Sequence, residues 1–415
     1  MGGALVRRLV DDHGALAAKT GLEFAVRRVA VRDTTKPREL PIDPAILTDD
    51  VSQLVGDDGI DLVVEVMGGL EPAGELVLSA LQAGKPVITA NKELVAARGP
   101  ELISAATEAG VPLLFEAAVG GGIPIIRPLA ETLAGEPVRR VLGIVNGTTN
   151  YILSEMADQG TSYPEALAEA QRLGFAEPDP TADVTGADAA SKASILASLA
   201  FGTWVGPENV YRQGITEIDE HDLRFADQLG YVVKLLAIAE RTDAGVSARV
   251  HPAMVPADHP LAAIRGATNA VFIEGPSVGE LLFAGPGAGG EPTATAVLGD
   301  VIDAARELLG GSQVAPRIRL APGEIVDFGD IGTKWCLRLE VMDAPGVLAR
   351  IAATFGDEGV SIKSVWQEGR GDRATLLMVT HAASESAQRK ASAALEGLDV
   401  VAEVASAIRV ESDEV

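Results

Sequence analysis

Hydrophobic strand patterns alternate with amphipathic helix patterns over the first 115 residues of the chain. Strands are predicted at 24–31, 61–66, 86–89 and 112–115, and helices at 5–10, 72–83 and 97–109. Because a strand, a helix and a second strand normally form a right-handed crossover in a parallel sheet, this alternation predicts an α/β fold. We expect a Rossmann-like nucleotide-binding domain here, to which residues 291–312 return as a helix.

The middle of the chain, residues 116–290, has a less regular pattern. Helices are predicted at 164–173, 187–200 and 219–240, and strands at 139–145 and 246–250. We interpret this part as an α+β domain for catalysis and dimerisation. Residues 313–334 contain several prolines and glycines and are predicted to be a linker.

A separate small module is predicted at residues 335–411. Its strands are predicted at 335–341, 360–366, 374–380 and 399–409, and its helices at 346–356 and 383–396. This β-α-β-β-α-β order is typical of the ferredoxin-like fold.

The start of the chain departs from the usual dinucleotide-binding pattern. Such a unit begins with a buried strand and a G-x-G-x-x-G turn before its first helix. Here Met1, Gly2 and Gly3 lead directly into an amphipathic helix. We therefore expect the first strand and the leading glycines to be missing, either because the chain is truncated or because its start is assigned too late.

Charge and cysteine content exclude several classes of protein. The formal net charge of −25 disfavours nucleic acid and anionic membranes as partners, since both attract basic proteins. Cys336 is the only cysteine, which excludes an intrachain disulfide. With no apolar run long enough to span a bilayer and no signal-peptide pattern, a soluble cytoplasmic protein is expected.

The densest polar segment runs from Glu177 to Lys192. Two prolines keep its first half outside a helix, and Asp188 and Lys192 then stand four residues apart on an alanine-rich helix. A lysine on so apolar a helix should be partly dehydrated, which suits it to proton transfer. A solvent-facing salt bridge is the alternative interpretation.

Several motifs together resemble homoserine dehydrogenase, in its single-function form with a C-terminal ACT domain. They are E-P-D-P-x-x-D-x-x-G-x-D-x-x-x-K at 177–192, T-A-N-K at 89–92, N-G-T-T-N-Y-I at 146–152, G-P-G-A-G at 285–289 and the ACT-like D-x-P-G-V-L at 343–348. The resemblance implies reversible NAD(P)-dependent interconversion of aspartate semialdehyde and homoserine, in the biosynthesis of threonine, methionine and isoleucine.

The resemblance also implies roles for individual residues. Lys192 would act as the general acid or base, and Asp188 would hold the substrate or a water molecule against it. The resemblance adds Glu177, Lys92 and Thr149 to the substrate contacts, and it places Arg32, Lys92, Gly174, Glu177 and Gly289 at the cofactor. Gly174 and Thr149 could instead only cap helices, and the loop ending at Gly289 could be only a tight turn.

Two further ligands are expected. Arg32 ends the second nucleotide-domain strand, where a basic residue can accept the 2′-phosphate of NADP, although the neighbouring Asp33 points toward NAD. By resemblance, a structural sodium or other monovalent cation would be bound by Glu116 and by the carbonyls of Val119, Gly121 and Ile123.

In the ACT-like module, Asp343 and Gly346 would bind threonine as an effector. The alternative is an oligomerisation module with an unused pocket, and a homodimer or homotetramer is expected in either case. Two other readings of the whole chain are a truncated homologue that acts only as an amino-acid-binding regulator, and an acylating dehydrogenase with Cys336 as nucleophile.

Overall fold

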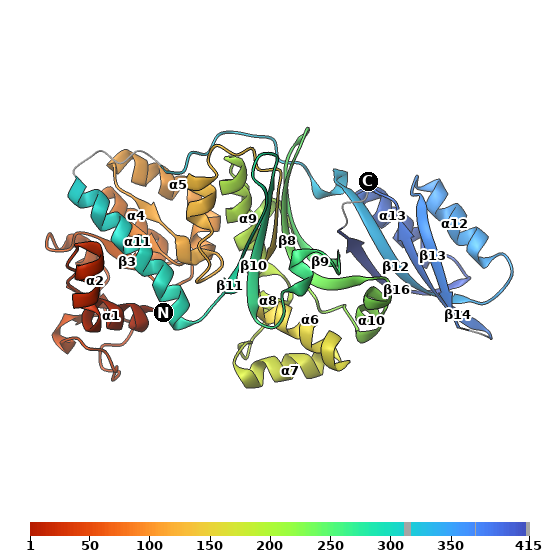
Figure 1. Cartoon of the computed structure of the whole chain (residues 1–415), viewed down its shortest axis with the longest axis horizontal. Helices are drawn as coiled ribbons and strands as arrows, with labels where there is room; N and C mark the ends of the chain where they lie inside the picture. Colours follow the sequence, from red (N-terminus) through yellow and green to blue (C-terminus); the bar gives the residue numbers. More distant parts are fainter. Residues whose placement is uncertain (311–316, 370, 412–415) are drawn as a thin grey trace. The chain divides into compact units, whose positions relative to one another are not determined.

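The computed structural model describes residues 1–310, 317–369 and 371–411 (Figure 1). Contacts divide the chain into two compact units. The first contains residues 1–141, 194–207 and 269–322, and the second contains residues 142–193, 208–268 and 323–415. Part of the predicted linker, residues 313–316, lies outside the described residues.

The first unit contains the predicted parallel sheet. Strands β3 (Val63–Glu65), β4 (Val87–Thr89) and β5 (Leu113–Leu114) pair in parallel, as the alternating pattern indicated. Strands β1 (Val29–Ala30) and β2 (Leu47–Thr48) form a second, separate parallel pair. Most of the predicted strand at 24–31 therefore has no regular secondary structure, and only its last part is paired.

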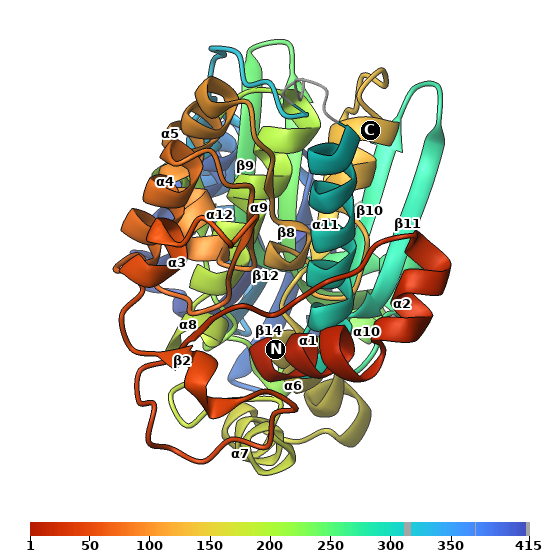
Figure 2. The ribbon, with the colours of Figure 1, turned by 90° about the vertical axis from the view of Figure 1, so that its left-hand side faces the viewer.

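Two groups of helices cover the strands β3 to β5. Helices α4 (Ala73–Gln82) and α5 (Lys92–Ala109) lie side by side (Figure 2) and pack with Val63 and Val87 in one core. Helix α11 (Gly290–Gly310) packs with α1 (Gly2–Asp11) and Ile88 in a second core. Gly2 and Gly3 belong to the helix itself rather than to a turn before it.

Other helices and strands of this unit include α2 (His13–Thr20), α3 (Ser52–Gly56), β10 (Thr268–Gly275), β11 (Gly279–Pro286) and the five-residue helical turn Pro128–Thr132.

One element predicted for the second unit is wrong. The expected helix at 219–240 is a helix followed by a strand: α10 (Glu220–Gln228) ends before Gly230, and β8 (Tyr231–Thr242) follows. Gly230 has φ +80°, a left-handed conformation that ends the helix. Strand β8 then pairs antiparallel with β9 (Gly245–Pro256) along its whole length.

The remaining elements of the middle segment are mainly helical. They are β6 (Arg140–Ile144), α6 (Gly147–Gln159), α7 (Tyr163–Leu173), α8 (Thr181–Val184), α9 (Ala187–Phe201) and β7 (Val210–Arg212). The last of these, β7, pairs in parallel with β9.

The C-terminal module has the predicted ferredoxin-like order. It comprises β12 (Gly332–Met342), α12 (Val347–Asp357), β13 (Ile362–Glu368), β14 (Arg373–Thr380), the short β15 (Ala383–Ser384), α13 (Glu385–Glu396) and β16 (Val401–Val410). Both helices contribute to the core beneath the sheet β16-β12-β14-β13. Strand β16 also pairs in parallel with β9, so the module's sheet continues into the hairpin β8–β9.

Within the described residues, no helix combines the length and the apolar composition needed to span a lipid bilayer.

Candidate functional site

Lys192 lies on α9 with its amine held at two sides. Its Nζ donates hydrogen bonds to Asp188 Oδ2 at 2.6 Å and to the carbonyl oxygen of Val145 at 2.7 Å. The side chains of Lys192 and Asp188 are only 12% and 7% exposed. The pair is therefore not the solvent-facing salt bridge of the alternative interpretation. Instead, the amine of Lys192 is partly dehydrated and is held by two hydrogen bonds.

A shared asparagine links this pair to a second carboxylate. Asn146 Nδ2 donates to Asp183 Oδ1 at 2.7 Å and to Asp188 Oδ2 at 2.9 Å. The side-chain oxygen of Asn146 meanwhile caps α6 by accepting from the Thr149 amide at 2.9 Å. Sequence reasoning gave no role to Asn146 or Asp183, although both stand inside the quoted motifs.

The local sequence explains how the two carboxylates meet. Pro178 and Pro180 keep the segment before α8 outside a helix, and α8 is only one turn long. Gly186 follows with φ +80°, so the chain reverses direction before α9 begins. Asp183 and Asp188 therefore stand on either side of a tight turn and reach the same amide group.

The other predicted substrate residues of this unit lie differently. Thr149 is buried, and its hydroxyl donates back to Asn146, which is the bonding of a helix cap. Gly174 is an exposed C-cap of α7 with φ +78°. Glu177 is exposed, and its backbone carbonyl accepts from Gln171.

A second lysine, which sequence reasoning did not consider, is buried beneath the N-G-T-T-N-Y-I motif. Lys234 of β8 is 1% exposed and donates to Asn150 Oδ1 at 3.1 Å and to the Ile264 carbonyl at 2.5 Å. Burial lowers the pKa of Lys234 to about 8. Because Asn150 also donates to the carbonyls of Gly266 and Thr268, this part of the motif anchors the loop before β10.

At the nucleotide end, the carboxyl ends of β3 and β4 are joined by Glu65. Its buried carboxylate accepts from Thr89 Oγ1 at 2.6 Å and from the amides of Met67 and Gly68. Asn91 caps α5 and donates to the Gly69 carbonyl at 2.6 Å, so that Lys92 is the first residue of the helix. Glu65 is a structural residue of this site that the sequence analysis missed.

The start of α1 lies among glycine-containing segments. A Cβ built on Gly2 would be 3.2 Å from the side chain of Val66, which follows β3, and one on Gly290 would be 3.7 Å from the Met1 nitrogen. Gly289 precedes α11 with φ +112°. A helix N-terminus between such segments can accept a phosphate group, since its amides are donors and close approach is possible.

Two arginines near β1, Arg32 and Arg38, differ in their surroundings. Arg32 is exposed, two residues after the strand. Arg38 instead turns back and donates to the backbone carbonyls of Asp33 and Lys36. Hydrogen bonds from Thr35 lower the pKa of Asp33, so this carboxylate stays ionised beside Arg32.

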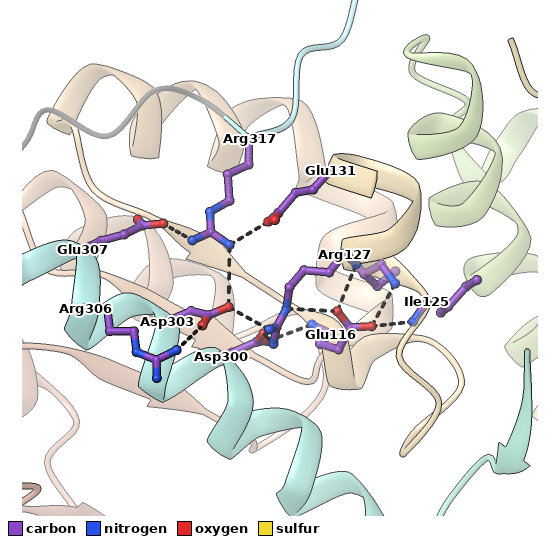
Figure 3. A network of polar contacts seen from close by, with 10 residues as sticks. Glu116, Ile125, Arg127, Glu131, Asp300, Asp303, Arg306, Glu307 and Arg317 are labelled. Atoms are coloured by element: carbon purple, nitrogen blue, oxygen red, sulfur yellow. Dashed lines mark hydrogen bonds and ion pairs between the residues drawn. The ribbon is translucent and has the colours of Figure 1, made fainter. Parts of the chain in front are cut away.

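The side chain of Glu116 has partners within the protein. Its carboxylate accepts from the amides of Ile125, Ile126 and Arg127 at 2.6, 2.8 and 3.0 Å, and Arg127 Nε lies 3.6 Å away (Figure 3). The carboxylate thus fixes the backbone of residues 125–127. Among the predicted cation ligands, this leaves the backbone carbonyls as the better suited donors.

The glycines of this loop explain its tight path. Gly120 and Gly121 both have positive φ, +71° and +59°. A Cβ on Gly121 would overlap the Gly287 carbonyl, so the loop packs directly against residues 286–288. Val119 and Ile123 are buried on either side.

An acidic residue of α11 lies beneath the same loop. Asp300 accepts from the Glu116 amide at 2.8 Å and from Arg127 Nη2 at 3.0 Å (Figure 3). Burial raises the pKa of Asp300 to about 7, despite these hydrogen bonds. Arg127 continues the network to Asp303, which also faces Arg317.

In the C-terminal module, the predicted effector residues stand at the start of α12. Gly346 caps the helix with φ +91°, and Asp343 is exposed and accepts from Gln367 Nε2 at 3.2 Å. Cys336, by contrast, is buried in β12, where burial raises the pKa of its thiol to about 12. A thiol so rarely ionised is a poor nucleophile, which argues against the acylating-dehydrogenase reading.

Profiles of known families match three parts of the chain. The family described as "Homoserine dehydrogenase, NAD binding domain" matches residues 1–116, "Homoserine dehydrogenase" matches residues 124–302, and "ACT domain" matches residues 337–399.

Individual relatives match nearly the whole chain. Homoserine dehydrogenase of Corynebacterium glutamicum is 48% identical over 417 residues, which cover 99% of this chain and 94% of the relative. The crystal structure of a homoserine dehydrogenase from Thiobacillus denitrificans is 41% identical with a TM-score of 0.92, covering 99% and 96%. A hyperthermophilic archaeal homoserine dehydrogenase in complex with NADPH is 33% identical with a TM-score of 0.56, covering 64% and 77%.

Proposed function

The chain belongs to the homoserine dehydrogenase family, and we propose that Lys192 and Asp188 carry the proton transfer of its reaction. The protein is an NAD(P)-dependent oxidoreductase that interconverts L-aspartate 4-semialdehyde and L-homoserine. The observation that supports these roles is the amine of Lys192, partly buried between Asp188 and the Val145 carbonyl.

The proposed reaction requires a proton donor and acceptor at the reacting oxygen of the substrate. The bound nicotinamide supplies or accepts the hydride. During reduction, Lys192 Nζ gives a proton to the substrate oxygen, and during oxidation it receives one from the hydroxyl. Asp188 fixes the amine in place, while the exposed Glu177 is proposed to pair with the substrate ammonium.

For the cofactor, we propose NADP rather than NAD. The N-terminus of α1, near Val66 and Gly290, suits the pyrophosphate, with Gly289 allowing close approach. We propose that the exposed Arg32 accepts the 2′-phosphate, which is supported by the structure of an archaeal relative in complex with NADPH. Lys92, at the end of β4, and Gly174 are proposed as further cofactor contacts.

The cofactor choice can be tested with one substitution. We expect Arg32→Ala to raise the KM for NADP+ about tenfold or more while leaving the KM for NAD+ within about twofold, since loss of a charged hydrogen bond costs about 1.5–3 kcal/mol. Equal changes for both cofactors would contradict the assignment. The neighbouring Lys36→Ala serves as a charge-matched control.

We further propose that the protein binds a monovalent cation and an amino-acid effector. The carbonyls of Val119, Gly121 and Ile123 would hold sodium or another monovalent cation, with Glu116 holding the loop in shape. Threonine is proposed to bind at Asp343 and Gly346, with its carboxylate at the start of α12. We also propose a homodimer or homotetramer in the cytoplasm.

The activity itself is tested by the reduction of NADP+ in the presence of L-homoserine. We expect the reaction to require homoserine, and threonine to shift the thermal melting of the wild type but not that of Asp343→Asn. A protein that binds threonine but reduces neither NADP+ nor NAD+ would favour the regulatory-only alternative.

A further inference from the structure

Arg409 on strand β16 contacts Gln213, a residue that follows β7. Arg409 of β16 is 3% exposed. Its Nε and Nη2 donate to Glu385 at 3.3 and 2.5 Å, whereas Nη1 donates to the side-chain oxygen of Gln213, the residue after β7. Gln213 is therefore the hydrogen-bond partner of a buried arginine that belongs to the C-terminal module.

The backbone around Gln213 is packed against the turn between α8 and α9. The Ile215 amide donates to the Val184 carbonyl at 2.9 Å. A Cβ on Gly214 would overlap that same carbonyl, and a Cβ on Gly186 would lie 3.4 Å from the Gln213 carbonyl oxygen. Residues 213–215 thus form a wall that lies directly against this turn.

The turn carries the two carboxylates of the site. Asp183 precedes Val184, and Asp188 follows Gly186, while Asn146 Nδ2 bonds both carboxylates at 2.7 and 2.9 Å. Any movement of residues 184–186 changes the position of Asp188, and with it the position of the Lys192 amine, which is 2.6 Å from Asp188.

We propose that Gln213 is a positioning residue for the dehydrogenase reaction. Held by Arg409, it fixes residues 213–215 against the turn and so keeps Asp183 and Asp188 at the separation that Asn146 bridges. The geometry around Lys192 then depends on where the C-terminal module places β16. This inference rests on the proposed roles of Lys192 and Asp188.

A second link between the C-terminal module and the middle segment provides a matched control. Arg338 of β12 donates to Asp219 Oδ2 at 2.6 Å and to Asp222 Oδ1 at 3.0 Å, at the start of α10. Asp219 is partly exposed, and neither carboxylate belongs to the 183–188 turn. Asp219→Asn weakens the attachment of the module without touching the wall behind the site.

The experiment compares kcat, both KM values and thermal melting for the wild type, Gln213→Ala, Gln213→Glu and Asp219→Asn. We expect Gln213→Ala to lower kcat about tenfold, equivalent to about 1.4 kcal/mol, with the KM for NADP+ within about twofold. Gln213→Glu keeps an acceptor for Arg409 and should restore kcat. Asp219→Asn should lower the melting temperature and leave kcat within about twofold.

Three results would overturn the inference. They are a kcat of Gln213→Ala within about twofold of the wild type, an equal loss of kcat in Gln213→Ala and Asp219→Asn, and a Gln213→Glu variant as slow as Gln213→Ala. If Gln213→Ala does not fold, Gln213→Leu replaces it, with the same expectation. A wild type that is inactive with homoserine would instead refute the proposed function, and the two failures are thereby distinguished.

Discussion

Replacing Glu385 by glutamine should destabilise the C-terminal module strongly. Glu385 begins α13 and is fully buried. Its carboxylate accepts from Thr333 Oγ1 at 2.8 Å, Trp335 Nε1 at 3.0 Å and Arg389 Nε at 2.9 Å, in addition to the two bonds from Arg409. Glu385→Gln keeps the shape of the side chain but removes its charge. It also places the donor NH2 group of glutamine opposite other hydrogen-bond donors.

The expected loss in the free energy of unfolding follows from the pKa of the Glu385 carboxylate. Burial alone would raise the pKa of Glu385, but the hydrogen bonds and charges of Arg409, Thr333 and Arg389 outweigh it and lower the pKa from 4.5 to about 2. This difference corresponds to about 3 kcal/mol of stability. Because the pKa is lower in the folded state, this stability is complete above roughly pH 5 and is lost as the pH falls toward about 2.

Urea unfolding of the full chain, followed by tryptophan fluorescence, measures the effect. At pH 7 the variant should lose about 3 kcal/mol, and the difference from the wild type should narrow progressively below roughly pH 5. Glu396→Gln, at the exposed end of the same helix, is the control and should change stability by less than about 0.5 kcal/mol. A difference that is small at pH 7, or that persists unchanged at pH 3, would show that the charge of Glu385 does not stabilise the module.

Three further predictions concern Cys336, Asp300 and Gly214. Cys336→Ser should leave kcat within about twofold, and iodoacetamide should not label the folded wild type at pH 8, because burial raises the thiol pKa to about 12; rapid labelling would contradict this. The wild type should lose up to about 4 kcal/mol of unfolding free energy between pH 4 and pH 7, because the pKa of Asp300 is raised to about 7 and the folded state holds the extra proton, whereas Asp300→Asn should lack this slope; parallel urea-stability profiles would exclude the assignment. Gly214→Ala should lower both the melting temperature and kcat, since its Cβ overlaps the Val184 carbonyl, whereas Gly135→Ala should change neither, because among the described residues its Cβ meets no atom within 4 Å.

Hydrophobic periodicity predicted the parallel sheet and the ferredoxin-like module because their elements are short and separated by clear turn residues. It failed at 219–240, where the amphipathic pattern of α10 runs directly into the apolar residues of β8. A long apolar run is compatible with a buried strand or a buried helix, so periodicity alone does not distinguish them. Gly230 was the local signal for the break.

Local spacing likewise predicted only part of the site. The contact between Asp188 and Lys192 follows from their spacing of four residues on one helix. The contacts of Asn146 with Asp183 and Asp188 join residues 37 and 42 positions apart, and only the tertiary fold brings them together. The bonds from the amides of Ile125 and Ile126 to the Glu116 carboxylate were not foreseen either, and the cation expected at Glu116 stays a prediction.

The proposed proton transfer by the amine of Lys192 is tested by kcat for NADP+-dependent oxidation of L-homoserine by the wild type and Lys192→Ala. We expect a loss of about a hundredfold to ten-thousandfold in kcat, with cofactor binding, measured by fluorescence titration, within about twofold. Comparable kcat values for the two proteins would contradict it.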